Sequence, residues 1–335
     1  MQFGDFSLDQ AEGTILAHTL TEAGGRFRKG MVLGREELAA LAACGVSHVT
    51  AARIGPDDVA EDAAAARLAA ALVPDPAGAG LDLSPAFTGR VNLKATGAGI
   101  VEMDVAAIHA LNRVDPSITL ATLAPLARVT PGQMVGTVKI ISYAVPEAAL
   151  ARACAQAAGA LRIRPVALAD ASLILTEVPG LPDKLNAKGR AAVEGRLDAL
   201  GMRLADCVTV PHDETALAQA LGRATGALLL ILTGSATSDL MDTAPQAVRR
   251  AGGQVARFGM PVDPGNLLFH GSLHGRPVIG LPGCARSPAL NGADWVLERI
   301  ACGLALSDDD IAVMGVGGLL KEIPLRPHPR ERARK

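Results

Sequence analysis

Two almost continuous apolar runs in the second half of the chain limit the folds available to it. Residues 171–177 read ASLILTE, and residues 226–232 read GALLLIL. Strands that are buried on both faces carry such runs, whereas half-exposed strands alternate apolar and polar residues. Strands are expected at 171–177, 207–210, 226–232, 254–260 and 276–281, and helices at 186–200, 213–224, 242–252 and 288–303. This alternation predicts a three-layer α/β domain, in which helices cover both faces of a mostly parallel sheet.

The first half of the chain predicts a mixed α+β lobe. Helices are expected at 9–20, 33–44, 57–73, 105–112 and 148–159, with short β-rich runs between them from residue 46 onwards. Because domains usually span roughly 100–200 residues, a chain of 335 residues favours two of them. We therefore expect the lobe at 1–165 with a linker near 74–86, the α/β domain at 166–306, and an extension with a basic tail at 307–335.

The composition argues against several classes of partner. Lys and Arg total 32 against 34 Asp and Glu, for a formal net charge of -2. Such a chain has no general attraction for nucleic acid or for an anionic membrane. Aromatic residues make up 2% of the chain, which leaves little from which to build stacking platforms for unpaired bases.

The cysteines and the apolar runs favour a cytoplasmic protein. The five cysteines are widely spaced, which fits neither a disulfide framework nor a CxxC zinc site. No apolar run has the length of a signal core or a membrane span. Reduced thiols in a cytoplasm are the simplest interpretation.

The loop after the second apolar run carries the first candidate site. Small and hydroxyl-bearing residues follow the strand in LLLILTGSATSDLMD, residues 228–242. Small residues let backbone N–H groups approach an anion, and the next helix adds a positive end. The candidates for binding phosphate or pterin are Thr233, Gly234, Ser235, Thr237 and Ser238. An ordinary strand-to-helix turn with Ser or Asp as N-cap explains the same pattern.

Two carboxylates belong to the same loop, Asp239 and Asp242. Acids beside a phosphate make sense where a divalent cation bridges them. We therefore regard both as candidates, with Asp242 as a metal ligand.

Other loops after expected strands add further candidates. Pro282 and Gly283 turn the chain in GLPGCARSP, and Arg286 can hold an anion through two parallel hydrogen bonds. Glu177 ends the first apolar run, and Gly265 and Asn266 belong to the turn in VDPGN. Ligands of such sheets bind beyond the carboxyl ends of the strands, where these loops are expected.

The first of these motifs is identified with a known family. The string LTGSATSDLMDTAPQAVRRAGG resembles the molybdopterin-binding domain shared by molybdopterin adenylyltransferases and molybdopterin molybdotransferases. That family has a Gly-Gly pair, then a Ser or Thr, then an Asp that opens the helix. Gly234, Ser235, Thr237 and Asp242 take these places, and Asp239 stands where the family has a small residue.

The other loops also resemble motifs of this family, but they differ from those motifs at some positions. GLPGCARSP is similar to the family's Leu-Pro-Gly-Asn-Pro, and VDPGN to its Pro-Gly-Lys-Pro turn without the Lys. GMPVDPGNLL, PGCARSP and MGVGGLLKEI resemble the molybdopterin-binding half that precedes a nucleotidyltransferase domain in molybdenum cofactor cytidylyltransferase-like proteins. A nucleotidyltransferase signature of the LAAGxSxRMG type does not occur in the sequence.

The resemblance implies a protein of molybdenum cofactor biosynthesis or modification with an α/β domain of the molybdopterin-binding type. It implies molybdopterin, with or without molybdenum, and Mg²⁺ as cofactors, and a homo-oligomer. Asp242, with Asp239, would then act in a molybdopterin-directed transferase. The alternative is a non-catalytic carrier that delivers the cofactor to a separate nucleotidyltransferase or to a molybdoenzyme. A nucleotide hydrolase is a third, more distant hypothesis.

Overall fold

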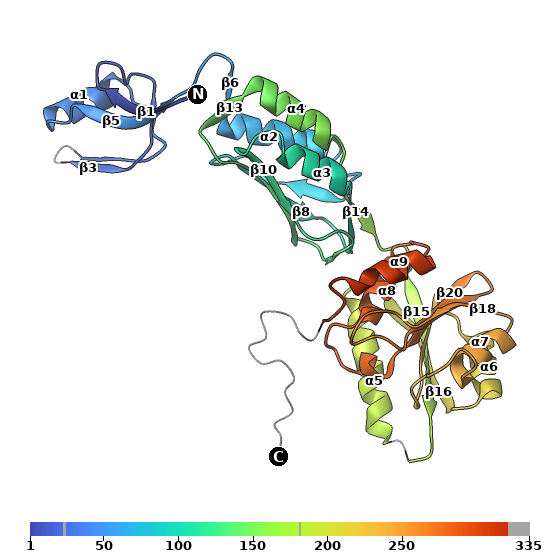
Figure 1. Cartoon of the computed structure of the whole chain (residues 1–335). Helices are drawn as coiled ribbons and strands as arrows, with labels where there is room; N and C mark the ends of the chain where they lie inside the picture. The colour runs from blue at the N-terminus through green and yellow to red at the C-terminus, as the bar shows by residue number, and fades with distance from the viewer. Residues whose placement is uncertain (23–24, 181, 321–335) are drawn as a thin grey trace, which may run out of the picture. The chain divides into compact units, whose positions relative to one another are not determined.

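The computed structural model of this chain describes residues 1–22, 25–180 and 182–320 (Figure 1). The chain forms two compact units, the first from residues 1–97 and 101–163, and the second from residues 98–100 and 164 onwards. Residues 321–335, which hold the basic end of the predicted extension, lie outside the described residues. Within the described ranges, no helix is both long and apolar enough to cross a bilayer.

The first 53 residues form a small β-sheet with one helix. The elements are β1 (Gln2–Ser7), β2 (Ile15–Leu16), β3 (Leu20–Glu22), β4 (Gly25–Phe27), α1 (Arg35–Ala43) and β5 (His48–Arg53). The sheet has the order β1-β5-β2, and both neighbours run antiparallel to β5. Phe6, Leu16, Leu33 and Leu41 form the centre of its apolar core.

The helix predicted at residues 9–20 is wrong. Gly13 has a φ of 76°, in the left-handed region that favours glycine and ends any regular helix. Ile15 and Leu16 pair with β5 instead, and the N–H of Leu16 donates to the carbonyl of Met31 over 2.8 Å. Pairing with strands distant in sequence therefore overrode a weak local helical pattern.

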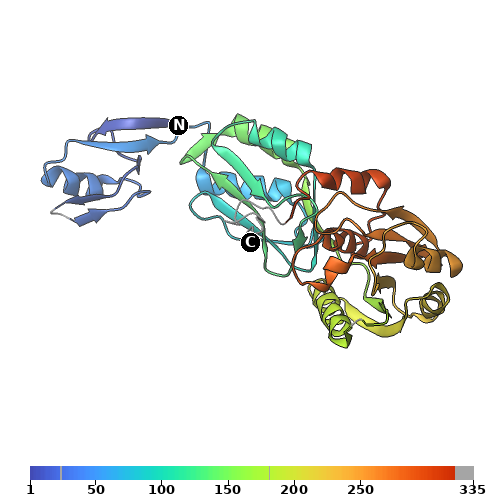
Figure 2. The ribbon, with the colours of Figure 1, turned by 60° about the horizontal axis from the view of Figure 1, so that its bottom comes forward.

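The next part of the chain, from residue 58, is an antiparallel sheet covered by helices and belongs to the first unit, except for the first two residues of β9 and the last two of β14. Its elements, which continue to residue 165, are β6 (Asp58–Ala60), α2 (Glu61–Leu72), β7 (Leu81–Leu83), β8 (Arg90–Ala95), β9 (Gly99–Met103), α3 (Val105–Asn112), β10 (Ile118–Thr122), β11 (Arg128–Val129), β12 (Met134–Ile140), β13 (Ala144–Pro146), α4 (Glu147–Ala157) and β14 (Leu161–Pro165). The main sheet has the order β10-β12-β8-β7. Helices α2, α3 and α4 lie together against it (Figures 1 and 2).

The second unit is built on a six-stranded sheet. Its elements are β15 (Asp170–Glu177), α5 (Asp183–Asp198), β16 (Arg203–Pro211), α6 (Glu214–Arg223), β17 (Leu228–Leu232), α7 (Thr243–Arg250), β18 (Gln254–Phe258), β19 (Phe269–Leu273), β20 (Arg276–Leu281), the 3-10 turn η1 (Gly283–Arg286), α8 (Gly292–Ala301), α9 (Asp308–Ala312) and the 3-10 turn η2 (Val313–Gly315). The strand order is β16-β15-β17-β20-β19-β18. Within this sheet β19 alone runs against the other strands, so the predicted mostly parallel α/β sheet is confirmed.

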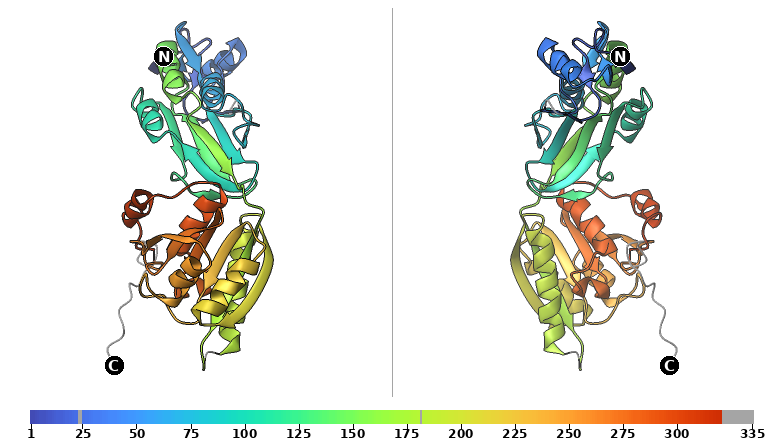
Figure 3. Two further views of the ribbon diagram at one scale, coloured as in Figure 1. Left: turned by 90° about the vertical axis from the view of Figure 1, so that its right-hand side faces the viewer. Right: turned by 90° about the vertical axis from the view of Figure 1, so that its left-hand side faces the viewer.

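Two helical layers cover the sheet of the second unit. Leu228, Leu230 and Leu232 of β17 pack toward α5 and α8, whereas Leu229 and Ile231 pack toward α6 and α7. Alternate residues of a strand point to opposite faces, so this strand is apolar at every position because both faces are covered. Figures 1 and 3 show the helices on the two sides of the sheet.

The register of the parallel strands brings their carboxyl ends to one edge. Leu232 of β17 is the partner of Leu175 in β15 and of Leu281 in β20. Glu177, at the end of β15, is the partner of Pro211 at the end of β16. The loops that follow these four strands therefore start side by side.

Candidate functional site

The bend after β17 is packed tightly against the end of β15. A Cβ atom on Gly234 would lie 2.8 Å from the carbonyl oxygen of Thr176 and 3.2 Å from the nitrogen of Val178. The N–H of Gly234 donates to the hydroxyl oxygen of Thr176 over 2.8 Å. Glycine is required here by the close approach of two backbones.

The same threonine holds a histidine that the sequence analysis did not select. The hydroxyl oxygen of Thr176 lies 2.9 Å from Nδ1 of His212, and the two share a hydrogen bond. The N–H of His212 donates to the carbonyl of Glu177 over 2.9 Å. Thr176 is fully buried and His212 is half-buried, so the imidazole is fixed at the strand-end edge. His212 directly follows β16, and the strand-end rule that selected the other loops also applies to it.

Asp242 caps the helix that follows the glycine bend. Its Oδ1 accepts from the N–H of Thr243 over 2.7 Å, and its Oδ2 accepts from the N–H of Ser238 over 2.9 Å and from the Ser238 hydroxyl over 3.3 Å. Burial alone would raise the pKa of Asp242, but the hydrogen bonds from Ser238 and Thr243, with the attraction of His212, outweigh it and lower the pKa. The carboxylate is thus ionised and held in place.

The remaining residues of this loop divide into exposed and buried ones. Ser235, Ser238 and Asp239 are exposed, and the side chain of Asp239 accepts from the N–H of Met241 over 2.7 Å. Thr233 and Thr237 are buried, with 4% and 7% of their surface exposed. The hydroxyls open to a ligand are therefore those of the two serines.

Arg286 joins the loop after β20 to the loop after β17. Its Nη2 donates to the carbonyl of Thr233 over 2.8 Å, and its stem packs near Gly189 of α5. Only 8% of the residue is exposed, and Nε is buried with no hydrogen-bond partner. Burial lowers the pKa of this guanidinium. Among the side chains that the structure describes, no carboxylate lies within ion-pair distance of Arg286.

The turn at Gly265 packs on the start of α8, next to this loop. Gly265 has a φ of 145°, and a Cβ atom there would lie 2.9 Å from Gly292. The amide of Asn291 donates to the sulfur of Cys284 over 3.1 Å, and its Oδ1 caps α8 at Ala293. The predicted helix at 288–303 begins at Gly292 because Asn291 provides this cap.

Some of the predicted site residues lie in loops that are bonded to each other, and others do not. The bend at Gly234 and the loop at Pro282, Gly283 and Arg286 meet through paired strands and the bond from Arg286 to Thr233. Glu177 is exposed beside the bend at the end of β15. Asn266 is exposed and donates weakly to the carbonyl of Met260 over 3.4 Å. No hydrogen bond between described residues ties Asn266 to the glycine bend.

The described part of the chain contains no group of three or more His, Cys, Asp or Glu side chains that could hold a metal ion. Asp242 therefore belongs to no described cluster of three or more such side chains.

These features define a mostly parallel α/β domain with polar loops where the strands end. Residues 174–301 match the family model described as "Probable molybdopterin binding domain". The second unit is therefore similar to molybdopterin-binding domains, and the strand-end loops lie within the matched residues. Residues 5–53 match a second model, "Domain of unknown function (DUF8806)".

Three solved structures are distantly similar to this chain. One is the molybdopterin biosynthesis MoeA protein from Pyrococcus horikosii, with 14% identity over 90% of this chain and 75% of that chain, and a TM-score of 0.32. Another is a molybdenum cofactor biosynthesis protein B, with 13% identity over 41% of this chain and 95% of that chain, and a TM-score of 0.30. A molybdenum cofactor biosynthesis protein from Pyrococcus furiosus has 12% identity over 85% of this chain and 59% of that chain, with a TM-score of 0.23. A search of the curated proteins finds no match.

Proposed function

We propose that the second unit binds molybdopterin at the carboxyl ends of β15, β17 and β20, and that the protein acts in molybdenum cofactor biosynthesis or modification. The family match over residues 174–301 supports the ligand class. The two loops after β17 and β20 start from paired strands and are tied by Arg286, which supports one shared site.

The main support for this proposal is the buried guanidinium of Arg286. A buried cation without a carboxylate partner is costly, and an anion that supplies hydrogen bonds removes most of that cost. Nε has no partner, and no hydrogen bond from Nη1 ends on a described residue. The terminal phosphate of molybdopterin provides the missing charge and acceptor atoms. The hydroxyls of Ser235 and Ser238 would then complete its binding from the neighbouring loop.

The exposed polar groups at this edge would receive the pterin. Glu177 and Asp239 are acceptors suited to the N–H groups of a pterin ring, and Asn266 offers both donor and acceptor. Asp242 is ionised, and its Oδ1 keeps one lone pair beyond the hydrogen bond from Thr243, whereas Oδ2 already accepts two hydrogen bonds from Ser238.

Mg²⁺ fits this site only together with the ligand. The ion is usually bound through one or two carboxylates plus substrate phosphates, and Asp242 supplies one carboxylate. When bound, the ion would neutralise phosphate charge. Asp242 would hold that position through the hydrogen bonds that fix it to Ser238 and Thr243.

Anaerobic titration calorimetry with molybdopterin tests the binding proposal. We expect Arg286→Met to weaken binding by about tenfold or more, because a charged hydrogen-bond donor is lost. The matched control is Arg190→Met, since Arg190 is exposed and, among the described residues, forms an ion pair with Glu194 alone, over 2.8 Å. Equal affinity of the Arg286 and Arg190 variants for molybdopterin would contradict the proposed binding site at Arg286.

A second measurement separates a transferase from a carrier. The loaded protein is incubated with Mg²⁺ and ATP, CTP or molybdate in turn, and the pterin is analysed by mass spectrometry. A nucleotidylated or molybdenum-containing product identifies a transferase. Cofactor recovered unchanged under all conditions identifies a carrier.

A further inference from the structure

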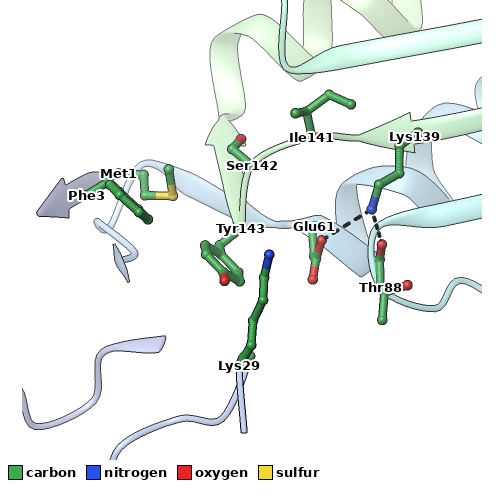
Figure 4. A pocket seen from close by; sticks show the side chains of 10 residues that line it. Met1, Phe3, Lys29, Glu61, Thr88, Lys139, Ile141, Ser142 and Tyr143 are labelled. Atoms are coloured by element: carbon green, nitrogen blue, oxygen red, sulfur yellow. Dashed lines mark hydrogen bonds and ion pairs between the residues drawn. The ribbon is translucent and has the colours of Figure 1, made fainter. Parts of the chain in front are cut away.

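The first unit contains a cavity of about 630 Å³ that belongs to no motif of the molybdopterin-binding domain. Small-molecule sites usually enclose roughly 300–1,000 Å³ and combine apolar walls with a few convergent polar groups. This cavity has both kinds of wall (Figure 4).

Apolar side chains line one part of the cavity and remain exposed. Phe3 is 55% exposed and Ile141 is 61% exposed. Both border the cavity, together with the ring of Tyr143. Large apolar side chains grouped at the mouth of a cavity are typical of ligand sites, whereas single exposed ones need no explanation.

Charged side chains converge on the other part. Figure 4 shows the ammonium of Lys29 and the carboxylate of Glu61 directed toward the same space beside Tyr143. Nζ of Lys139 lies 3.9 Å from Oε2 of Glu61 and also donates to the carbonyl of Thr88. Two ammonium groups therefore face one carboxylate.

The balance of these charges indicates a singly charged anion. Burial raises the pKa of Glu61, and the nearby Lys139 and Lys29 oppose that rise. Two other charged groups near Glu61 are already engaged, because the N-terminal ammonium of Met1 pairs with Asp58 and the carboxylate of Asp62 accepts from the N–H of Gly89. With Glu61 ionised, the ammonium groups of Lys29 and Lys139 therefore exceed the charge of the carboxylate that they face by one. A ligand carboxylate matches that single charge, whereas a doubly charged phosphate would exceed it.

We propose that this cavity binds a planar aromatic carboxylate. Its carboxylate would lie between Lys29 and Lys139, and its ring would pack between Phe3 and Tyr143. This site is independent of the molybdopterin site, because its lining residues all belong to the first unit.

The single tyrosine of the chain gives a direct probe. Biosynthetic labelling with 3-fluorotyrosine places one ¹⁹F nucleus in the full-length protein, at Tyr143 in the cavity wall. We expect 2-naphthoate to shift its resonance saturably. Inorganic phosphate, which lacks the ring, and 2-naphthalenemethanol, which lacks the charge, should leave the resonance in place at the same concentration. No shift with 2-naphthoate, or the same shift with either control compound, would overturn the proposal.

Two lysine variants locate the carboxylate. Lys29→Gln changes an exposed side chain that makes no hydrogen bond to a described residue, so the fold should be kept. We expect it and Lys139→Gln to raise the half-saturating concentration of 2-naphthoate about tenfold, the effect of losing a charged hydrogen bond. Lys184→Gln, at an exposed position of the second unit, is the matched control. A folded Lys29→Gln protein that binds as tightly as this control would contradict the assignment.

Discussion

The guanidinium of Arg286 donates through Nη2 to the carbonyl oxygen of Thr233, 2.8 Å away, across the ends of two paired strands. This bond connects the two loops that the sequence had suggested as walls of one site. The guanidinium is buried, and no described carboxylate forms an ion pair with it. The predictions below follow from its position and from the loops that it joins.

Arg286→Met should fold at least as stably as the wild type. Replacement of a buried charge by an apolar group of similar length is often neutral or stabilising. The methionine keeps part of the stem that packs near Gly189. Pyrophosphate should raise the melting temperature of the wild type because it binds the folded state, and this increase should disappear in the variant. Thermal unfolding with and without pyrophosphate checks both points, and an equal increase in both proteins would contradict the phosphate assignment.

Gly234→Ala should destabilise the second unit by about 1–3 kcal/mol, the usual cost of forcing an extra methyl group into a packed site. The new Cβ would lie 2.8 Å from the carbonyl oxygen of Thr176. Ser235→Ala, one residue further, should leave stability unchanged because Ser235 is exposed, while weakening ligand binding. Urea unfolding of the two variants measures the difference. Similar free energies of unfolding would show that the bend is not as tight as described.

The carboxylate of Asp242 should make the free energy of unfolding depend on pH in the acid range. Its pKa is lowered in the folded state, so its stabilising contribution is present above the unfolded pKa, near about 4, and is lost as pH falls through the folded value. Asp242→Asn keeps an N-cap residue but removes this dependence. The wild type should therefore lose more free energy of unfolding than the variant between about pH 6 and about pH 3.

Asp309→Asn provides the control for this comparison. Asp309 is exposed at the start of α9, and its side chain makes no hydrogen bond to a described residue. This variant should follow the wild-type curve across the pH range. If Asp242→Asn also followed it, the carboxylate would not be held as the structure indicates.

The cysteines should report occupancy of the site. Cys284 is exposed in the loop that contains Arg286, whereas Cys302 is buried and burial raises the pKa of its thiol to about 11. Iodoacetamide should therefore alkylate Cys284 well before Cys302, since the thiolate is the reactive form. Bound molybdopterin should slow alkylation of Cys284. Peptide mass spectrometry measures both rates, and an unchanged Cys284 rate at saturating ligand would place the ligand elsewhere.

Much of the second unit could be predicted because its strands are buried on both faces. Residues 228–232 are apolar at every position, and the strand-end rule then located the loops at Gly234 and Gly283.

One helix of the first unit could also be predicted. The helix predicted at 105–112 matches α3, where the side chain of Asp104 accepts from the N–H of Ala107 and fixes the start of the helix. A local sequence feature with a clear physical cause, such as this N-cap, was sufficient to predict the element.

Other features depend on contacts between residues that are far apart in the sequence, which a local sequence pattern does not show. Ile15 and Leu16 formed a strand because β5, more than 30 residues further on, supplied the partner. The bond between Thr176 and His212 joins β15 to the residue that follows β16, and neither residue has a local motif. The sequence marked Arg286 as an anion-binding candidate but did not reveal its burial, which results from packing against α5 and the loop after β17.

The mass of the small molecule released from the protein tests the central claim most directly. Wild type, Arg286→Met and Arg190→Met would be produced in the same molybdopterin-synthesising cells, purified anaerobically and denatured for mass spectrometry. We predict that molybdopterin, or its molybdenum-containing form, is released from the wild type and from Arg190→Met, and is nearly absent from Arg286→Met. Release of no pterin from the wild type, or of equal amounts from all three proteins, would contradict the account.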